Sequence, residues 1–268
     1  MPRKKTSPKK EPKSGDEPRE KKIKVSHVSV EDEDLTESKE SSSTPKNWPA
    51  AYENMKTMME GVVAPLESMP WYQARDPEQT KPEERFRILV ALMLSSQTKD
   101  DQTLKVWNNL CKEGLSIDWV LEKSNSELSD MIKSVNFRSK KATYIQKTAT
   151  ILKEKYNGDT PDNLKELAAL PGVGNKMAFL FLQSCYGKCD GLGVDVHLQR
   201  LANRLGWVKK NSKDADKIRI ELESWVPKEM IFEFNRLIPR FGQMKCTANN
   251  PICDECLNNK ICPSAGKC

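Results

Sequence analysis

Apolar residues recur at helical spacing from Trp48 onward, and strict apolar–polar alternation is almost absent. Because residues three and four positions apart share one face of a helix, this spacing predicts amphipathic helices rather than strands. The sequence therefore predicts an all-α body. Its expected helices span residues 84–95, 101–112, 117–122, 127–134, 139–156, 164–170, 175–186, 195–205, 214–225 and 228–241.

Three local features refine this helical pattern. Ser124 with Glu127 has the spacing of a capping box, which predicts a helix start there. The stretch 87–94 is apolar nearly all round, which is typical of a helix buried at the centre of a protein. Pro239 lies inside the last predicted helix and lacks an amide hydrogen, so we expect a kink or an early stop there.

Residues 1–47 differ in composition from the rest of the chain. They hold few apolar side chains among Lys, Glu, Ser and Pro, so we expect a disordered tail. Its charge falls in two blocks, with ten basic and four acidic residues in 1–24 and two basic and six acidic residues in 25–47. The basic stretches 2–5 and 19–24 suit nuclear import or loose contact with nucleic acid, and a merely solvated tail is an equal alternative.

The body from residue 48 has 32 basic and 28 acidic residues, which is compatible with a polyanionic partner without indicating one. No apolar run reaches the roughly 20 residues of a membrane helix, and no secretory signal precedes the body. We therefore expect a soluble intracellular protein. Four of the eight cysteines crowd together near the C-terminus at metal-ligand spacing, which favours a reducing compartment.

The segment 170–174, Leu-Pro-Gly-Val-Gly, joins two predicted helices in a tight turn. Glycine at 172 and 174 is expected to permit positive φ and to leave the backbone amides bare. Amides at a helix N-terminus bind phosphate oxygens, so the turn is a candidate helix-hairpin-helix for the DNA backbone. An ordinary turn with two glycines is the alternative. The candidate DNA-binding residues here are Leu170, Gly172, Val173 and Gly174.

Lys176 is expected as the second residue of the next helix, near its positive dipole end and half-buried in a cleft wall. Both effects disfavour the charged amine, and a neutral amine can attack carbon to form a Schiff base. A cation touching phosphate is the alternative. Asp195 opens the following helix, where it could face Lys176 or cap the helix, and His197 is assigned to packing or hydrogen bonding.

The last cysteines have the spacing C-x6-C-x2-C-x5-C, at Cys246, Cys253, Cys256 and Cys262. Four thiolates near one point suit zinc or an iron–sulfur cluster, and the spacing alone does not choose between them. Cys268 follows after a further five residues.

The order of these motifs, from Leu-Pro-Gly-Val-Gly-Asn-Lys through Val-Asp-Val-His to the four cysteines, resembles the endonuclease III family of DNA glycosylases over 48–267. The resemblance implies two helical domains that flank a DNA cleft. One is a six-helix domain with the hairpin at 78–188, and the other combines 48–77 with 189–268. It also implies a [4Fe-4S] cluster on the four cysteines, with Cys268 left free.

The resemblance also implies the chemistry. Lys176 would attack C1′ of a damaged nucleotide, expel the base and form an imine that undergoes β-elimination, while Asp195 promotes deprotonation or stabilises charge on the sugar. Gln97 would fill the hole left by the extruded nucleotide. A second insertion loop corresponds to 135–138, where Asn136 stands for the usual glycine and is expected to adopt its left-handed turn, beside Phe137.

The function implied is that of a monomeric, bifunctional glycosylase and abasic-site lyase of base-excision repair. Its partner would be double-stranded DNA with oxidised pyrimidines or abasic sites, in the nucleus and optionally in mitochondria. A MutY-like adenine glycosylase is a rival that typically lacks the lysine, and a non-catalytic DNA-binding module is another. The loop 247–252, often basic in the family, is uncharged here, and Lys245 is the candidate to compensate.

Overall fold

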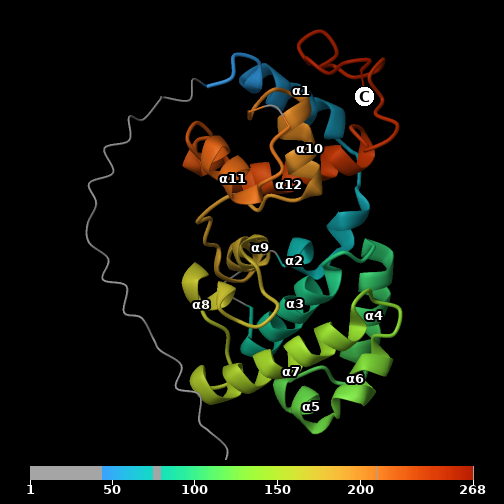
Figure 1. The fold of residues 1–268 in the computed structure, drawn as a ribbon, viewed down its shortest axis with the longest axis vertical. Helices are drawn as coiled ribbons and strands as arrows, with labels where there is room; N and C mark the ends of the chain where they lie inside the picture. The colour runs from blue at the N-terminus through green and yellow to red at the C-terminus, as the bar shows by residue number, and fades with distance from the viewer. Residues whose placement is uncertain (1–43, 75–79, 210, 268) are drawn as a thin grey trace, which may run out of the picture. The chain divides into compact units, whose positions relative to one another are not determined.

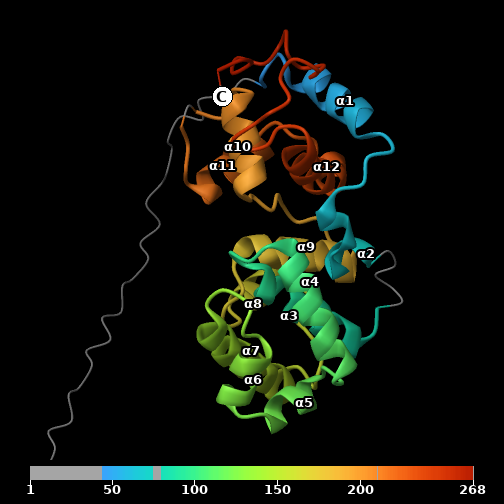
Figure 2. The same ribbon diagram turned by 90° about the vertical axis from the view of Figure 1, so that its right-hand side faces the viewer.

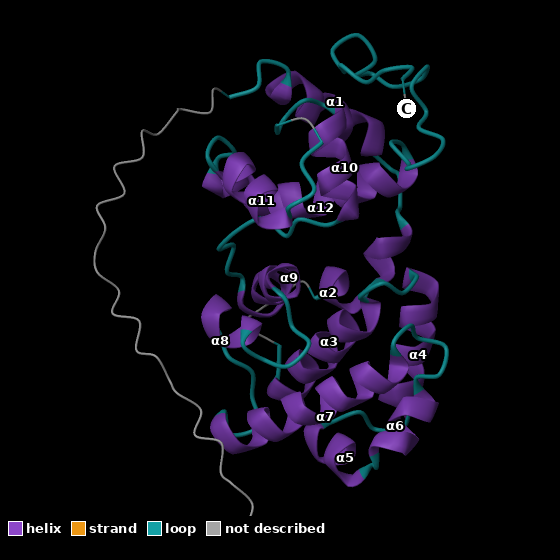
Figure 3. Cartoon of the chain, in the orientation of Figure 1, coloured by secondary structure: helices purple, strands orange, loops and turns teal. Residues whose placement is uncertain are grey.

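The protein is built of helices in the computed structural model, which describes residues 44–74, 80–209 and 211–267. Within these ranges there is no strand (Figure 3), so the all-α prediction is confirmed. None of the described helices is long and apolar enough to cross a bilayer. The elements are α1 (Trp48–Met59), η1 (Pro65–Ser68), α2 (Pro70–Gln73), α3 (Pro82–Ser95), α4 (Asp100–Lys112), α5 (Ile117–Glu122), α6 (Asn125–Met131), α7 (Arg138–Lys155), α8 (Leu164–Ala168), α9 (Asn175–Tyr186), α10 (Val196–Arg204), α11 (Ala215–Glu223), η3 (Lys228–Met230) and α12 (Ile231–Met244).

Most helix ends lie within two residues of the predicted positions, and α5 and α9 match them at both ends. The capping box at Ser124 is present, since its hydroxyl accepts from the Glu127 amide. The predicted tail, apart from residues 44–47, and Cys268 lie outside the described residues, so those predictions stay as they are.

Helices α3 to α8 gather at one end of the unit 41–268, and α1, α10, α11 and α12 gather at the other (Figures 1 and 2). Helices α2 and α9 lie between the two groups in both views. Helix α7 packs against α3, α5 and α6, while α12 packs against α1 and α10.

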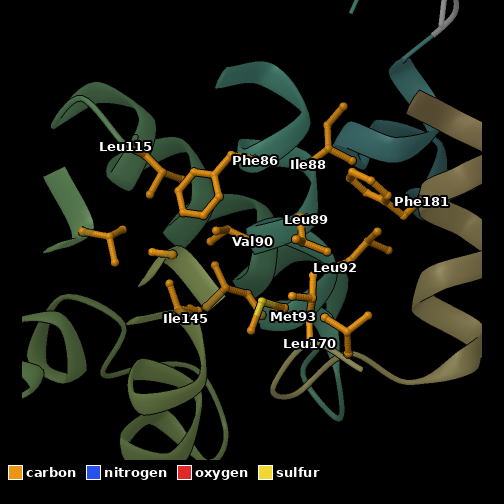
Figure 4. Close-up of a cluster of buried hydrophobic side chains, with 14 of the residues drawn as sticks. Phe86, Ile88, Leu89, Val90, Leu92, Met93, Leu115, Ile145, Leu170 and Phe181 are labelled. Carbon is orange, nitrogen blue, oxygen red and sulfur yellow. The ribbon is translucent and has the colours of Figure 1, made fainter. Parts of the chain in front are cut away.

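The first hydrophobic core surrounds α3, whose residues from Ile88 to Leu94 are all buried. Their neighbours include Leu115, Ile145, Leu170 and Phe181, which reach α3 from several other elements (Figure 4). Burying each large aliphatic or aromatic side chain contributes about 1.5–3 kcal/mol, so a helix buried on every face is a major source of stability. The prediction of a central buried helix is confirmed.

The second core is rich in aromatic side chains and joins α1 to the C-terminal third of the chain. Tyr52 of α1 stacks on Phe234 of α12 with ring centroids 5.8 Å apart, and Trp48 lies edge-on to Trp207. The buried members of the two cores come from 86–185 in the first case and from 48–59 with 192–241 in the second. This division supports the proposed domain bounds, which remain a prediction.

Pro239 does not end α12, which continues to Met244, so the expected early stop is wrong. Proline has no amide hydrogen for the carbonyl of Asn235, one turn earlier. The Tyr72 hydroxyl donates to that carbonyl at 3.3 Å and to the Arg236 carbonyl at 3.2 Å. A side chain from α2 therefore replaces the missing backbone donor, which lets the helix persist.

Candidate active site

The hairpin turn between α8 and α9 requires glycine at one position only. Gly172 has φ +80°, and a Cβ there would lie 2.6 Å from the Tyr144 ring. Gly174 has φ −101° and open space around it, so the expected positive φ at this residue is wrong. It is the extended N-cap residue of α9, a conformation open to any residue.

The backbone amides at the start of α9 are bare. No side chain caps this helix, and in the described part of the chain the Gly172 and Gly174 amides donate no hydrogen bond. The Val173 amide, by contrast, donates to the Leu170 carbonyl at 3.1 Å, and both side chains are buried. Leu170 and Val173 therefore shape the turn, while the first amides of α9 offer an anion site. DNA contact by any of the four residues stays a prediction.

Replacing Gly172 with alanine should destabilise the turn, whereas the same change at Gly174 should not. The left-handed conformation costs about 1–2 kcal/mol for a residue with a Cβ, and overlap with Tyr144 adds to this. We expect Gly172→Ala to lower the free energy of unfolding by about 2 kcal/mol and Gly174→Ala by less than ~0.5 kcal/mol. Thermal unfolding of the two variants measures the difference, and equal melting temperatures would contradict the assigned geometry.

Lys176 and Asp195 face each other. Lys176 is the second residue of α9, as predicted, and Asp195 is the N-cap of α10. The Asp195 Oδ1 atom accepts from the amides of His197 and Leu198 at 2.9 and 2.8 Å, while Oδ2 lies 3.6 Å from Lys176 Nζ. The capping role and the pairing role therefore hold together, each on its own oxygen.

The two partners differ in exposure. The Lys176 side chain lies at the cleft wall and is 45% exposed, while that of Asp195 is 11% exposed. Both line a cleft of about 830 Å³, to which Gln97 and Gly174 also contribute. Pockets of roughly 300–1,000 Å³ hold small ligands, so the cleft has room for one extruded nucleotide beside the amine.

Asn235, which the sequence analysis missed, holds the segment that carries Asp195. Its side-chain oxygen accepts from the Gly193 amide at 2.9 Å, and its nitrogen donates to the Gly191 carbonyl at 3.1 Å and to Gln183 Oε1 at 2.9 Å. Asn235 is 4% exposed, and a buried amide is costly unless it is paired in this way. An asparagine between core residues of an apolar helix face was the available signal.

His197 serves packing and hydrogen bonding, as predicted. The His197 Nδ1 atom lies 3.0 Å from Arg200 Nη2. Its side chain packs closely on Gly242, where an added Cβ would lie 2.8 Å from the His197 Cβ. Burial lowers the pKa of His197, because a half-buried imidazolium loses hydration.

The four predicted metal ligands, Cys246, Cys253, Cys256 and Cys262, line one apolar cavity after the end of α12. All four are half-buried, and Arg204 donates to Cys246 Sγ at 3.3 Å. In the described ranges, no group of three or more His, Cys, Asp or Glu side chains is arranged to hold a single metal ion. The four thiols therefore border one shared cavity.

Comparison with known proteins places this geometry in a family. Residues 90–228 match the HhH-GPD superfamily of base excision DNA repair proteins. Endonuclease III-like protein 1 of Bos taurus is 40% identical over 221 residues, which cover 82% of this chain and 72% of that protein. The endonuclease III homolog of Schizosaccharomyces pombe is 39% identical over 238 residues, covering 86% and 65%. The chain belongs to the endonuclease III family.

Solved structures agree with this assignment. A trapped covalent intermediate of endonuclease III with DNA is similar with a TM-score of 0.71 and 26% identity, over 83% of this chain and 97% of that one. A non-covalent endonuclease III–DNA complex has the same TM-score at 27% identity, over 83% and 96%. As a member of the endonuclease III family, the protein is a DNA glycosylase and abasic-site lyase of base-excision repair.

The two insertion candidates both have left-handed backbones. Gln97 has φ +53° and Phe137 has φ +58°, and the Phe137 side chain is exposed. The left-handed residue of this second loop is therefore Phe137, the N-cap of α7, and the expectation of that conformation at Asn136 is wrong. Asn136 instead donates its side-chain amide to the Gln97 carbonyl, which ties the two endonuclease III-like loops together.

Arg204, also missed, holds the uncharged loop of residues 247–252. Its guanidinium donates to the carbonyls of Thr247 and Ala248 at 2.6 and 2.8 Å. Lys245 is half-buried as the C-cap of α12, and its compensating phosphate contact stays a prediction. An arginine at the end of a helix carried no motif that could have pointed to this role.

Proposed function

We propose that Lys176 is the nucleophile and Asp195 its electrostatic partner in removing oxidised pyrimidines from duplex DNA. The observation that supports this most is the 3.6 Å approach of Lys176 Nζ to Asp195 Oδ2 in a cleft next to the bare amides of α9. An amine that attacks a sugar carbon needs a group to take its proton and a neighbouring negative charge to stabilise the positive sugar.

The reaction would proceed in two stages. The neutral amine of Lys176 attacks C1′, and the bond from C1′ to the base breaks with its electron pair leaving on the base, which takes up a proton. The C1′–O4′ bond then breaks, O4′ takes up a proton, and the lysine nitrogen shares its electron pair with C1′ to form an imine on the ring-opened sugar. Loss of a C2′ proton breaks the C3′–O bond, and the strand is nicked. The buried Asp195 carboxylate lies where it can accept the Lys176 proton or stabilise charge on the sugar.

DNA would be held by its backbone. The first amides of α9 would bind a phosphate without reading sequence, and Gln97 at the cleft wall would occupy the space left by the extruded nucleotide. Phe137 is exposed on the loop that Asn136 ties to the Gln97 loop, and it would enter the DNA duplex beside Gln97. The protein would act as a monomer.

The proposal is tested by single-turnover excision and borohydride trapping on thymine glycol, abasic and adenine-mismatch duplexes. We expect release of the oxidised pyrimidine, nicking of the abasic strand and a trapped complex with both. Binding without nicking would favour a non-catalytic module. Release of adenine without trapping would favour a MutY-like activity, and either result would overturn the proposal.

We further propose that the four C-terminal cysteines hold a [4Fe-4S] cluster. Support comes from the four thiols, which line one cavity as the four thiolate ligands of such a cluster would. Such a cluster binds the segment after α12, which has no regular helix of its own among residues 245–267. Its role here would be structural, since none of the cysteines that the structure describes lines the cleft.

Purified protein should therefore show a broad visible absorbance band and about four irons per chain. Cys256→Ser should lose the band and most of the iron, because one ligand is removed. Cys111→Ser is the matched control, since Cys111 is a half-buried cysteine of the first core and should leave both unchanged. A colourless wild-type sample with one zinc per chain would contradict the cluster.

We also propose that the protein is located in the nucleus, with mitochondria as a second candidate location. Its support is the pair of basic stretches at 2–5 and 19–24. Residues 1–47 fused to a fluorescent protein should direct it to the nucleus, and an even distribution through the cell would oppose the idea.

A further inference from the structure

Lys141 on α7 is a buried amine outside the catalytic pair. The residue is 7% exposed, and its Nζ atom donates to the Leu94 carbonyl at 2.7 Å, the Ser96 carbonyl at 2.6 Å and Thr98 Oγ1 at 3.1 Å. An ammonium has three hydrogens, so all of its donors are used. In the described part of the chain, no carboxylate pairs with it.

The three acceptors belong to the segment that ends α3 and leads into α4. Carbonyls in the last turn of a helix lack intrahelical partners, and a cation there is favoured by the helix dipole. Burial lowers the pKa of Lys141 to about 8, so the amine keeps its proton at neutral pH. A buried cation held only by backbone and hydroxyl oxygens therefore fixes the path of residues 94–98.

Gln97 lies within that fixed segment in a strained conformation. Its φ of +53° is uncommon for a residue with a side chain, and it costs on the order of 1 kcal/mol or more. Such strain persists only where the surroundings impose it. Lys141 binds both flanks of Gln97, and Asn136 binds the Gln97 carbonyl itself. The Gln97 side chain remains exposed at the cleft.

The same face of α7 also seats the hairpin. The Tyr144 ring fills the space that a Cβ on Gly172 would need, and Thr148 donates to the Pro171 carbonyl at 3.2 Å. Residues 141, 144 and 148 are spaced three and four apart, so they share one side of the helix. One helix thus sets the distance between the phosphate-binding turn and the insertion loop.

We propose that Lys141 is a positioning residue that locks the 94–98 segment so that Gln97 projects into the DNA duplex. This rests on the proposed function of Gln97. Lys141 touches neither DNA nor the reacting atoms, and it acts through the loop that it binds. Its loss should therefore slow the extrusion of a paired nucleotide and spare the chemistry on a sugar whose base is already absent.

The test compares excision of a paired thymine glycol with nicking of a pre-formed abasic site, for wild type and Lys141→Met. Methionine keeps most of the side-chain volume and removes the three donors. We expect excision to fall at least about tenfold, as for a misplaced loop, and abasic-site nicking to fall less than about threefold. A 2-aminopurine reporter next to the lesion should show a matching loss of extrusion.

Lys147→Met is the matched control, since Lys147 is an exposed residue of α7 whose loss removes the same charge. It should leave the ratio of the two rates unchanged. If Lys141→Met does not fold, Asn136→Ala carries the test, because Asn136 is exposed and its side-chain amide binds the Gln97 carbonyl in the segment that Lys141 also holds. The same split between substrates is then expected.

Equal losses on both substrates, or no loss on either, would overturn the proposal. Failure of the underlying function is distinguishable, because wild-type protein would then neither excise the paired lesion nor nick the abasic site. If wild type does both and the variants show no split, the positioning role alone is wrong.

Discussion

Replacing Lys176 with glutamine should abolish borohydride trapping and lower the rate of strand nicking by about 10⁴-fold or more, as for loss of a covalent nucleophile in other enzymes. Glutamine has a similar reach but no basic nitrogen, so no imine forms. DNA affinity should fall less than about tenfold, because the phosphate grip proposed here comes from backbone amides at the start of α9. Gel-resolved trapping and a binding titration at fixed salt measure the two effects.

Lys165→Gln is the control for this variant. Lys165 is exposed on α8, the first helix of the hairpin, so the change removes one positive charge from the hairpin without touching the cleft. It should keep full trapping. An undiminished trapped complex with Lys176→Gln would remove Lys176 from the nucleophilic role and leave it as a phosphate contact.

Asp195→Asn should lower the single-turnover rate by about 10²–10⁴-fold while leaving the fold intact. The asparagine oxygen can still accept the two amides that Asp195 Oδ1 now binds, so the N-terminus of α10 stays capped. What is lost is the charge 3.6 Å from Lys176 Nζ. The expected result is a near-normal melting temperature with slow chemistry.

The chain offers a second aspartate with the same capping geometry as a control. Asp214 caps α11 by accepting from the amides of Asp216 and Lys217 at 3.0 and 3.2 Å, and it has no part in the cleft. Asp214→Asn should leave the rate within about twofold. If Asp195→Asn slows the reaction no more than this, its carboxylate serves only the helix.

Most helices from α3 onward were predictable because they depend on local order along the chain, whereas α1 and α2 were not among the predicted helices. Periodic apolar residues, a capping box and well-placed prolines mark most ends within two residues. Pro239 shows the limit. Its effect depends on Tyr72, which is distant in sequence and supplies the missing donor. A hydrogen-bond donor that is placed by tertiary packing cannot be predicted from the sequence around Pro239.

The site divides in the same way. Lys176, Asp195 and the four cysteines lie in motifs, and the structure brings the first two together and arranges the others around one cavity. Lys141 binds backbone atoms distant in sequence, so no spacing predicts its contacts, and the only signal for Asn235 was an asparagine within an apolar helix face.

The two oxygens of Asp195 have separate roles, since Oδ1 caps α10 and Oδ2 faces Lys176, and few other side chains could fill both. Glutamate would carry the same charge, yet its longer chain could not serve the α10 amides and remain opposite Lys176 from the same backbone position. The short Asp195 side chain thus supplies both the negative charge opposite Lys176 and the N-cap of α10. A residue that neither caps nor carries a charge, such as alanine, should therefore both slow the reaction and fray the N-terminus of α10.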